Sequence, residues 1–169
     1  MTTGSGDLTA DRVIEGRLKA GSGTLRVREV GDIQAKTGSG EVHIDRASGT
    51  VIIETGSGDV HLGDAGITNT ISVASGDVTV GELAGQLELK SASGDIGVHR
   101  AVEGELRART ASGDFTVGVA EGTAAKLDCS SIAGRIRSDL DPANEPGESD
   151  RQLLVSSSSA SGSATIRRA

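Results

Sequence analysis

Aromatic residues are almost absent from this chain. Its 169 residues include one Phe, Phe115, and neither Trp nor Tyr. Since aromatic side chains supply much of the area that a thick globular core buries, such a core is hard to build here. The hydrophobic residues that remain are mostly Val, Ile, Leu and Ala, which suit a thin core made of narrow layers.

Cysteine and long apolar runs are also scarce. A single cysteine, Cys129, excludes an internal disulfide framework. No stretch approaches the roughly 20 apolar residues of a membrane helix, and the first residues lack the basic and apolar regions of a signal peptide. We therefore expect no membrane span and a cytoplasmic location, or a surface location if the chain is a fragment of a longer protein.

Positive charge is in the minority, with 17 Lys and Arg against 24 Asp and Glu and a net charge of −7. Nucleic acid is disfavoured as a partner, because binding to phosphates requires a basic surface. Glycine, in contrast, is abundant at 25 residues. It follows no collagen-like period, and the regular alternation of Val and Ile argues against disorder.

A short motif, Ser-Gly followed by a polar and then a hydrophobic residue, repeats along the chain. Its glycines are Gly6, Gly23, Gly40, Gly58, Gly76, Gly94, Gly113 and Gly162. A variant, Ala-Gly-Arg-Ile around Gly134, fits between the last two, so that the spacings run from 17 to 19 and end with 21 and 28. A second glycine series lies half a period away. The pattern predicts coils of about 18 residues, each with two short strands and two glycine-marked turns.

Hydrophobic residues alternate with polar ones around each motif glycine, which is the period of a strand with one buried face. Eighteen residues cannot form a compact unit alone, so each coil must bury its apolar face against its neighbours. Small hydroxyl residues recur three positions before the glycine, at Thr37, Thr55, Ser91, Thr110 and Ser131. Stacking of like on like favours a parallel solenoid over a meander of antiparallel hairpins. We predict an all-β parallel β-solenoid, similar to a β-helix or β-roll, of about eight coils in one domain over residues 1–169.

Two segments depart from the pattern. In the fourth coil Asn69 and Val73 occupy a hydrophobic and a hydroxyl position, which predicts a register shift or bulge there. Residues 137–152 carry both prolines and five carboxylates. This segment is predicted to be an acidic loop inserted in the last full coil.

The repeats at 55–63 and 74–82, and the tail at 119–128 and 163–168, resemble a bacterial domain-of-unknown-function family of actinobacterial type, described as an adhesin with β-strand repeats. The resemblance covers essentially the whole chain. It implies a β-solenoid fold and transfers no catalytic or binding residue. Members of that family are expected to carry a further segment before the repeats, whereas this chain begins inside a coil.

One acidic column follows the motif glycines, formed by Glu41, Asp59, Asp77, Asp95 and Asp114. Carboxylates stacked in this way could form a calcium ladder, because calcium prefers oxygen ligands. Alternatively, each aspartate accepts backbone N–H bonds within its own turn. The sequence differs from the calcium-binding nonapeptide repeat, since Asp follows Gly directly. These five residues are therefore a weak candidate metal site.

No other residues suggest chemistry. His43 and His61 share an outward column and His99 lies elsewhere, so we expect solvated histidines. Cys129 and Phe115 fall at inward positions and are expected in the core. No nucleophile and base occur in a recognisable arrangement, and no phosphate-binding loop is present. The sequence therefore predicts no enzyme activity and no cofactor.

Outward columns carry charges of both signs. Glu88, Arg107 and Asp128 are expected to alternate in one column of successive coils, and Lys36 and Glu54 in another. Such exposed pairs contribute a few tenths of a kcal/mol each, so their expected benefit is register and solubility.

The functional hypothesis is a non-catalytic structural or interaction solenoid. The chain begins inside a coil and stops three residues after Ile166, so both ends are expected to be uncapped and to bind a protein partner or a second copy. A calcium-stabilised surface adhesin is the alternative, and a carbohydrate-active enzyme is the least favoured one.

Overall fold

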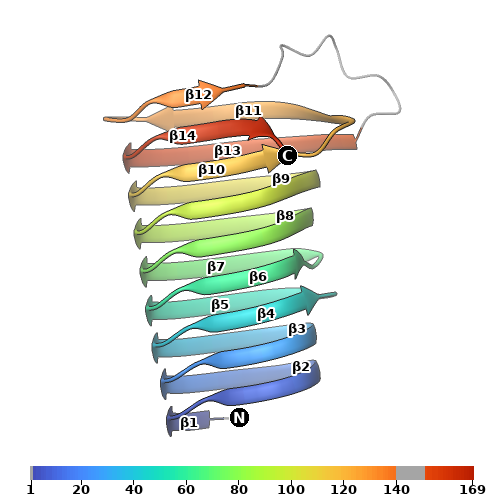
Figure 1. The fold of residues 1–169 in the computed structure, drawn as a ribbon, viewed down its shortest axis with the longest axis vertical. Helices are drawn as coiled ribbons and strands as arrows, with labels where there is room; N and C mark the ends of the chain where they lie inside the picture. Colours follow the sequence, from blue (N-terminus) through green and yellow to red (C-terminus); the bar gives the residue numbers. More distant parts are fainter. Residues whose placement is uncertain (1, 140–150) are drawn as a thin grey trace.

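The computed structural model describes residues 2–139 and 151–169. These residues form strands that stack in parallel into one continuous solenoid of about seven turns, close to the eight that the repeats predict (Figure 1). The parallel β-solenoid is confirmed. The strands are β1 (Thr2–Ser5), β2 (Leu8–Ser22), β3 (Leu25–Ser39), β4 (Val42–Ala47), β5 (Thr50–Ser57), β6 (Val60–Ala65), β7 (Thr68–Ser75), β8 (Val78–Ser93), β9 (Ile96–Ser112), β10 (Phe115–Val119), β11 (Thr123–Ser131), β12 (Ile136–Ser138), β13 (Arg151–Ser161) and β14 (Ala164–Arg168).

The stack is held together by like residues lying above one another. Val42 pairs with Val60, and Val60 pairs with Val78, each in the next coil. The inward residues of the middle coils are fully buried, so the core is a thin column of aliphatic side chains that runs the length of the solenoid. The described residues contain no helix long and apolar enough to cross a membrane.

Only one of the two predicted turns is a sharp corner throughout. The Ser-Gly corner interrupts the strands in every coil, whereas β2, β3, β8 and β9 run through the half-period position as single strands of 15 to 17 residues. The second turn breaks the strand between β4 and β5, between β6 and β7, and between β10 and β11. Two short strands per coil are therefore correct for these coils, whereas in β2, β3, β8 and β9 the chain bends at the second turn without a break.

The fourth coil has no register shift, so that prediction is wrong. Strand β7 pairs with β5 and β8 without interruption, and Asn69 takes the place of an aliphatic residue. Its side chain is 1% exposed, and its amide donates to the carbonyls of Gly66 (2.9 Å) and Gln86 (3.1 Å). These bonds let a polar residue occupy the core without a bulge. The irregularities lie instead at Leu83/Ala84 and Val117/Val119.

The last coils do not stack in chain order. Strand β13 pairs with β9 on one side and β11 on the other, and β14 lies between β10 and β12 (Figure 1). The predicted order, with the Gly134 coil beneath the Gly162 coil, is therefore wrong. The end of the stack is formed by β11 and β12, and Ile166 is buried inside it. Most of the acidic loop predicted at 137–152 lies outside the described residues, while Arg137 belongs to β12 and Gln152 to β13.

The crossover from β10 to β11 skips the level that β13 and β14 fill. The three residues between Val119 and Thr123 must therefore climb one coil spacing, about 4.8 Å, more than the same segment of an ordinary coil. The Arg168 guanidinium donates to the carbonyls of Ala120 (3.1 Å) and Thr123 (3.2 Å), and the Thr123 hydroxyl donates to Val102 O (2.7 Å). The inserted coil thus fixes the connection that steps over it.

Candidate functional site

The Ser-Gly corners stack into a column in which only glycine fits. All eight motif glycines have φ between +120° and +148°, a region that other residues rarely adopt. A Cβ on Gly76 would collide with the carbonyl oxygen of Gly58 in the preceding coil and would lie 2.7 Å from its carbon. The corner is therefore set both by backbone conformation and by the close approach of successive coils.

The acidic column forms a ladder of bonds between coils. Asp59 Oδ1 accepts from the Asp77 backbone N–H (2.9 Å), Asp77 from that of Asp95 (2.8 Å), and Asp95 from that of Asp114 (2.8 Å). The ladder ends at the Ser163 N–H, which donates to Asp114 (2.8 Å). The expectation that each carboxylate bonds within its own turn is wrong, because stacking brings it beside the N–H of the next coil.

Asp7 makes the same bond to the Thr24 N–H at 2.8 Å. Glu41 is different, since its carboxylate lies 3.1 Å from His43 Nε2 instead. No three His, Cys, Asp or Glu side chains within 2–139 and 151–169 are placed to hold a metal ion. One oxygen of each ladder carboxylate accepts a bond from a backbone N–H, so the ladder connects each coil to the next.

The histidine column lies where the sequence places it. The rings of His43 and His61 lie in neighbouring coils with centroids 5.8 Å apart and are tilted by 41° relative to one another. His99 is exposed and lies outside this column. Apart from Glu41, the described structure places no carboxylate or thiol in hydrogen-bond contact with these rings. The arrangement offers no nucleophile with an adjacent base.

The outward charges form ion pairs, but not all those expected. Lys36 and Glu54 pair at 2.6 Å, as predicted. Glu88 pairs with Lys90 (2.9 Å) in its own strand, and Asp128 lies two coils from Arg107 because Ser156 occupies the level between them. The alternating column through Asp128 is therefore wrong, and the inserted coil is the reason.

A second charge column was missed by the sequence reasoning. Arg46 lies between Glu29 (3.5 Å) and Asp64 (3.3 Å) of the neighbouring coils, and Arg100 pairs with Glu82 at 3.1 Å. The sequence could have predicted these ion pairs, because the opposite charges are 17 or 18 residues apart, which is one coil. The side chains are exposed, so these pairs favour the correct register of coils more than they raise stability.

Among the described residues, one titratable group has a clearly shifted pKa. The Lys90 ammonium donates a hydrogen bond to Glu88 and adds its positive charge, which lowers the pKa of the Glu88 carboxyl from its ordinary value. Lys90 and Glu54 also line a shallow groove of about 860 Å³ along the Ser-Gly side of the solenoid. Small residues such as Ala74 and Ala92 also line this groove, and its lining contains no histidine or cysteine.

The Toastrack DUF4097 family matches residues 1–169, the whole chain. The chain belongs to this family. The match agrees with the expected domain of unknown function and with the β-solenoid observed here. Neither curated proteins nor solved structures give a match. The fold of this Toastrack domain fits a non-catalytic repeat protein.

One end of this Toastrack solenoid is formed by β11 and β12 among the described residues. Strand β11 pairs with β13 on its inner side, and its outer edge has no strand partner among the described residues. Its inward residues Ala125, Leu127 and Cys129 pack against the core yet are only half-buried. Cys129 is therefore the inward residue that the sequence predicts, but at the boundary of the core. Nearby, Ile132 is 88% exposed and Ile136 46% exposed.

Proposed function

We propose that this Toastrack domain is a non-catalytic interaction module whose end coil binds a protein partner by strand addition. The observation that carries the proposal is the outer edge of β11, which offers nine residues of extended backbone with a partner on one side only among the described residues. An exposed strand edge presents unpaired N–H and C=O groups that another strand can bind.

The half-buried side chains of the same strand support the proposal. An added strand would cover Ala125, Leu127 and Cys129 while it completes the backbone hydrogen bonds. Backbone bonding would supply affinity, and these alternate side chains would supply specificity. The inner edge of β11 already binds β13 in parallel over nine paired residues, so the strand is compatible with a sheet partner.

The proposal is tested with a fluorescently labelled peptide that has the sequence of β13, residues 151–161. We expect the peptide to bind the full chain, measured by fluorescence anisotropy. Leu127→Lys, which places a charge on the inward face of the edge, is expected to weaken binding at least tenfold. The matched control, Ser130→Lys, changes an exposed outward residue of the same strand and should leave binding unchanged.

Equal binding by the wild-type chain and the Leu127→Lys variant would refute strand addition at this edge. Absence of peptide binding together with absence of any self-association in sedimentation would refute the proposed function as a whole. Circular dichroism of both variants establishes that a loss of binding is not a loss of fold.

A further inference from the structure

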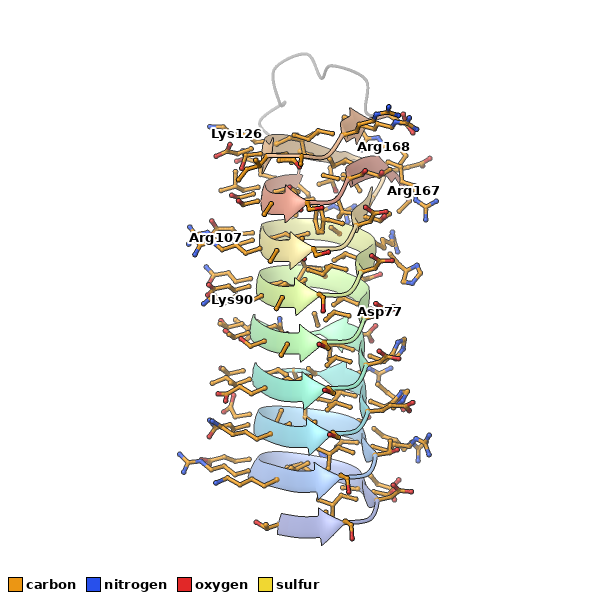
Figure 2. The ribbon with its side chains drawn as sticks, turned by 90° about the vertical axis from the view of Figure 1, so that its left-hand side faces the viewer. Asp77, Lys90, Arg107, Lys126, Arg167 and Arg168 are labelled. Carbon is orange, nitrogen blue, oxygen red and sulfur yellow. The ribbon has the colours of Figure 1, made fainter. Side chains whose placement is uncertain are left out.

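Strand β11 carries two charges that form no ion pair with any residue of 2–139 or 151–169. Lys126 and Asp128 are exposed on either side of Leu127, and no ion pair joins them to each other or to any described residue. Their neighbours in the coil below are Leu154 and Ser156, which are uncharged. Figure 2 shows Lys126 in the end coil, on the same side of the solenoid as Lys90 and Arg107.

Two pairs of charges with the same spacing in the inner coils form ion pairs. Lys90 bonds to Glu88 and Arg107 bonds to Glu105, in both cases across two residues of one strand. Lys126 and Asp128 have the same two-residue spacing without such a bond. The unpaired charges thus coincide with the strand whose outer edge has no partner in the described structure.

The sequence of β11 is complementary to itself when two copies run antiparallel. Leu127 is the central residue of the nine in Thr123–Ser131. With two strands related by a two-fold axis at Leu127, each Lys126 faces Asp128 of the other copy, and each Ala125 faces Cys129. Directly opposed residues in an antiparallel pair have Cβ atoms about 4.5 to 5.5 Å apart, which is within reach of an ion pair.

We propose that β11 is a homodimer interface, in which it pairs antiparallel with β11 of a second copy about Leu127. The inference rests on the proposed function, because it uses the same edge, and it names the partner. Alternation of side chains keeps inward residues opposite inward ones, so that both halves of the thin core are covered together. The interface uses one patch twice, so association stops at the dimer.

A parallel arrangement of the same two strands is disfavoured by charge. In register, it would place Lys126 beside Lys126 and Asp128 beside Asp128 of the second copy, and like charges directly opposite one another are destabilising. Only the antiparallel pairing brings both opposite-charge pairs together. The choice between these arrangements therefore depends on two exposed side chains that can be exchanged without touching the core.

The test is a charge exchange followed by sedimentation velocity over a range of concentrations. We expect the wild-type chain to dimerise. In a dimer of Lys126→Asp, the new carboxylate at 126 of each copy faces Asp128 of the other. In a dimer of Asp128→Lys, the new amine at 128 of each copy faces Lys126 of the other. Each variant alone should dimerise at least tenfold more weakly. Mixing the two variants should restore dimerisation, because every pair across the axis then has opposite charges, and the double exchange in one chain should restore it as well.

The outcomes separate this inference from the proposed function. A wild-type chain that binds the 151–161 peptide but stays monomeric at every concentration overturns the homodimer and leaves strand addition standing. If both single variants dimerise as strongly as the wild-type chain, the interface lies elsewhere and the inference is also overturned. Since both side chains are exposed, the variants are expected to fold, which circular dichroism checks.

A cysteine variant gives an independent measurement. Ala125→Cys places a thiol opposite Cys129 of the second copy, whereas the two positions within one chain lie four residues apart, about 13 Å along a strand. That distance is too long for a disulfide within a chain. We expect a disulfide-linked dimer on oxidation of this variant. We expect none for Ala124→Cys, because residue 124 faces Ser130 of the second copy and its side chain points to the opposite face from Cys129. Equal cross-linking of both variants would contradict the antiparallel register.

Discussion

Replacement of one corner glycine by alanine should damage the whole stack, although it adds a single methyl group. Gly76 has φ of +133°, and a Cβ there would collide with the carbonyl of Gly58. The left-handed backbone costs a non-glycine residue about 1 to 3 kcal/mol. Forcing an atom into a packed site costs about 1 to 3 kcal/mol more. Gly76→Ala is therefore expected to lower the free energy of unfolding by about 2 to 6 kcal/mol.

The matched control is Gly97→Ala, in the strand that follows the next corner. A Cβ on Gly97 would meet no atom within 4 Å, and its backbone is not in the left-handed region. We expect a change within about 0.5 kcal/mol, as for most exposed substitutions. The assay is urea unfolding followed by circular dichroism, with midpoints compared at equal slope. If the two variants are equally stable, the argument from close coil approach is wrong.

The remaining predictions concern the ladder, one ion pair and the coil order. Asp77→Ala removes the acceptor of the Asp95 N–H and should cost about 1 kcal/mol in urea unfolding, because the bond is exposed. The pKa of Glu88 is lowered in the fold, so its contribution to the free energy of unfolding is present above the unfolded pKa and is lost as pH falls through the folded pKa. Glu88→Gln should therefore reduce the loss of stability on acidification by a few tenths of a kcal/mol. Ser157→Cys should form a disulfide with Cys129, its direct neighbour across β11 and β13.

Each of these has a control in the same chain. Asp77→Asn keeps an oxygen acceptor and should lose less stability than Asp77→Ala, and the reverse order would contradict the ladder. Identical acid limbs for the wild-type chain and Glu88→Gln would contradict the role of Lys90. Ala108→Cys lies two coils from Cys129, about 9.6 Å away, and should not cross-link. A disulfide there would show that β11 stacks directly on β9.

The columns of this solenoid could be predicted because they follow from local alternation. A strand exposes every second side chain to the same face, so the burial of Val51, Ile53 and Leu62 follows from the repeat alone. The same holds for the Ser-Gly corner, which repeats in the sequence wherever the coil turns. Asn69 shows the limit of this reasoning, because two carbonyls accept from its amide nitrogen and the strand stays in register without a bulge.

The partners of the corner carboxylates could not be predicted in the same way. Asp77 occupies one position in the repeat whether its oxygen bonds its own turn or the next coil. The outcome depends on the height between coils, which places the Asp95 N–H at 2.8 Å from Asp77 Oδ1. The spacing of the repeats predicts that the corner carboxylates lie in one column. Which N–H each carboxylate accepts from is seen only in the stacked structure.

The order of the last coils was hidden for a related reason. Ser131 and Ser159 both carry the small hydroxyl that the column requires, so either could lie on Thr110. The burial of side chains separates them. Leu153 and Val155 of β13 are almost completely buried, whereas the corresponding Ala125 and Leu127 of β11 are half-buried.

Ala125 and Leu127 are half-buried because β11 ends the stack and no described strand pairs with its outer edge. The 21-residue step from Gly113 to Gly134, longer than the earlier ones, gives the crossover the length to pass over the inserted coil. Because β11 rather than β13 ends the stack, the exposed edge carries Lys126 and Asp128 instead of Leu154 and Ser156. The insertion of one coil thus determines the chemistry of the surface that is open to a partner.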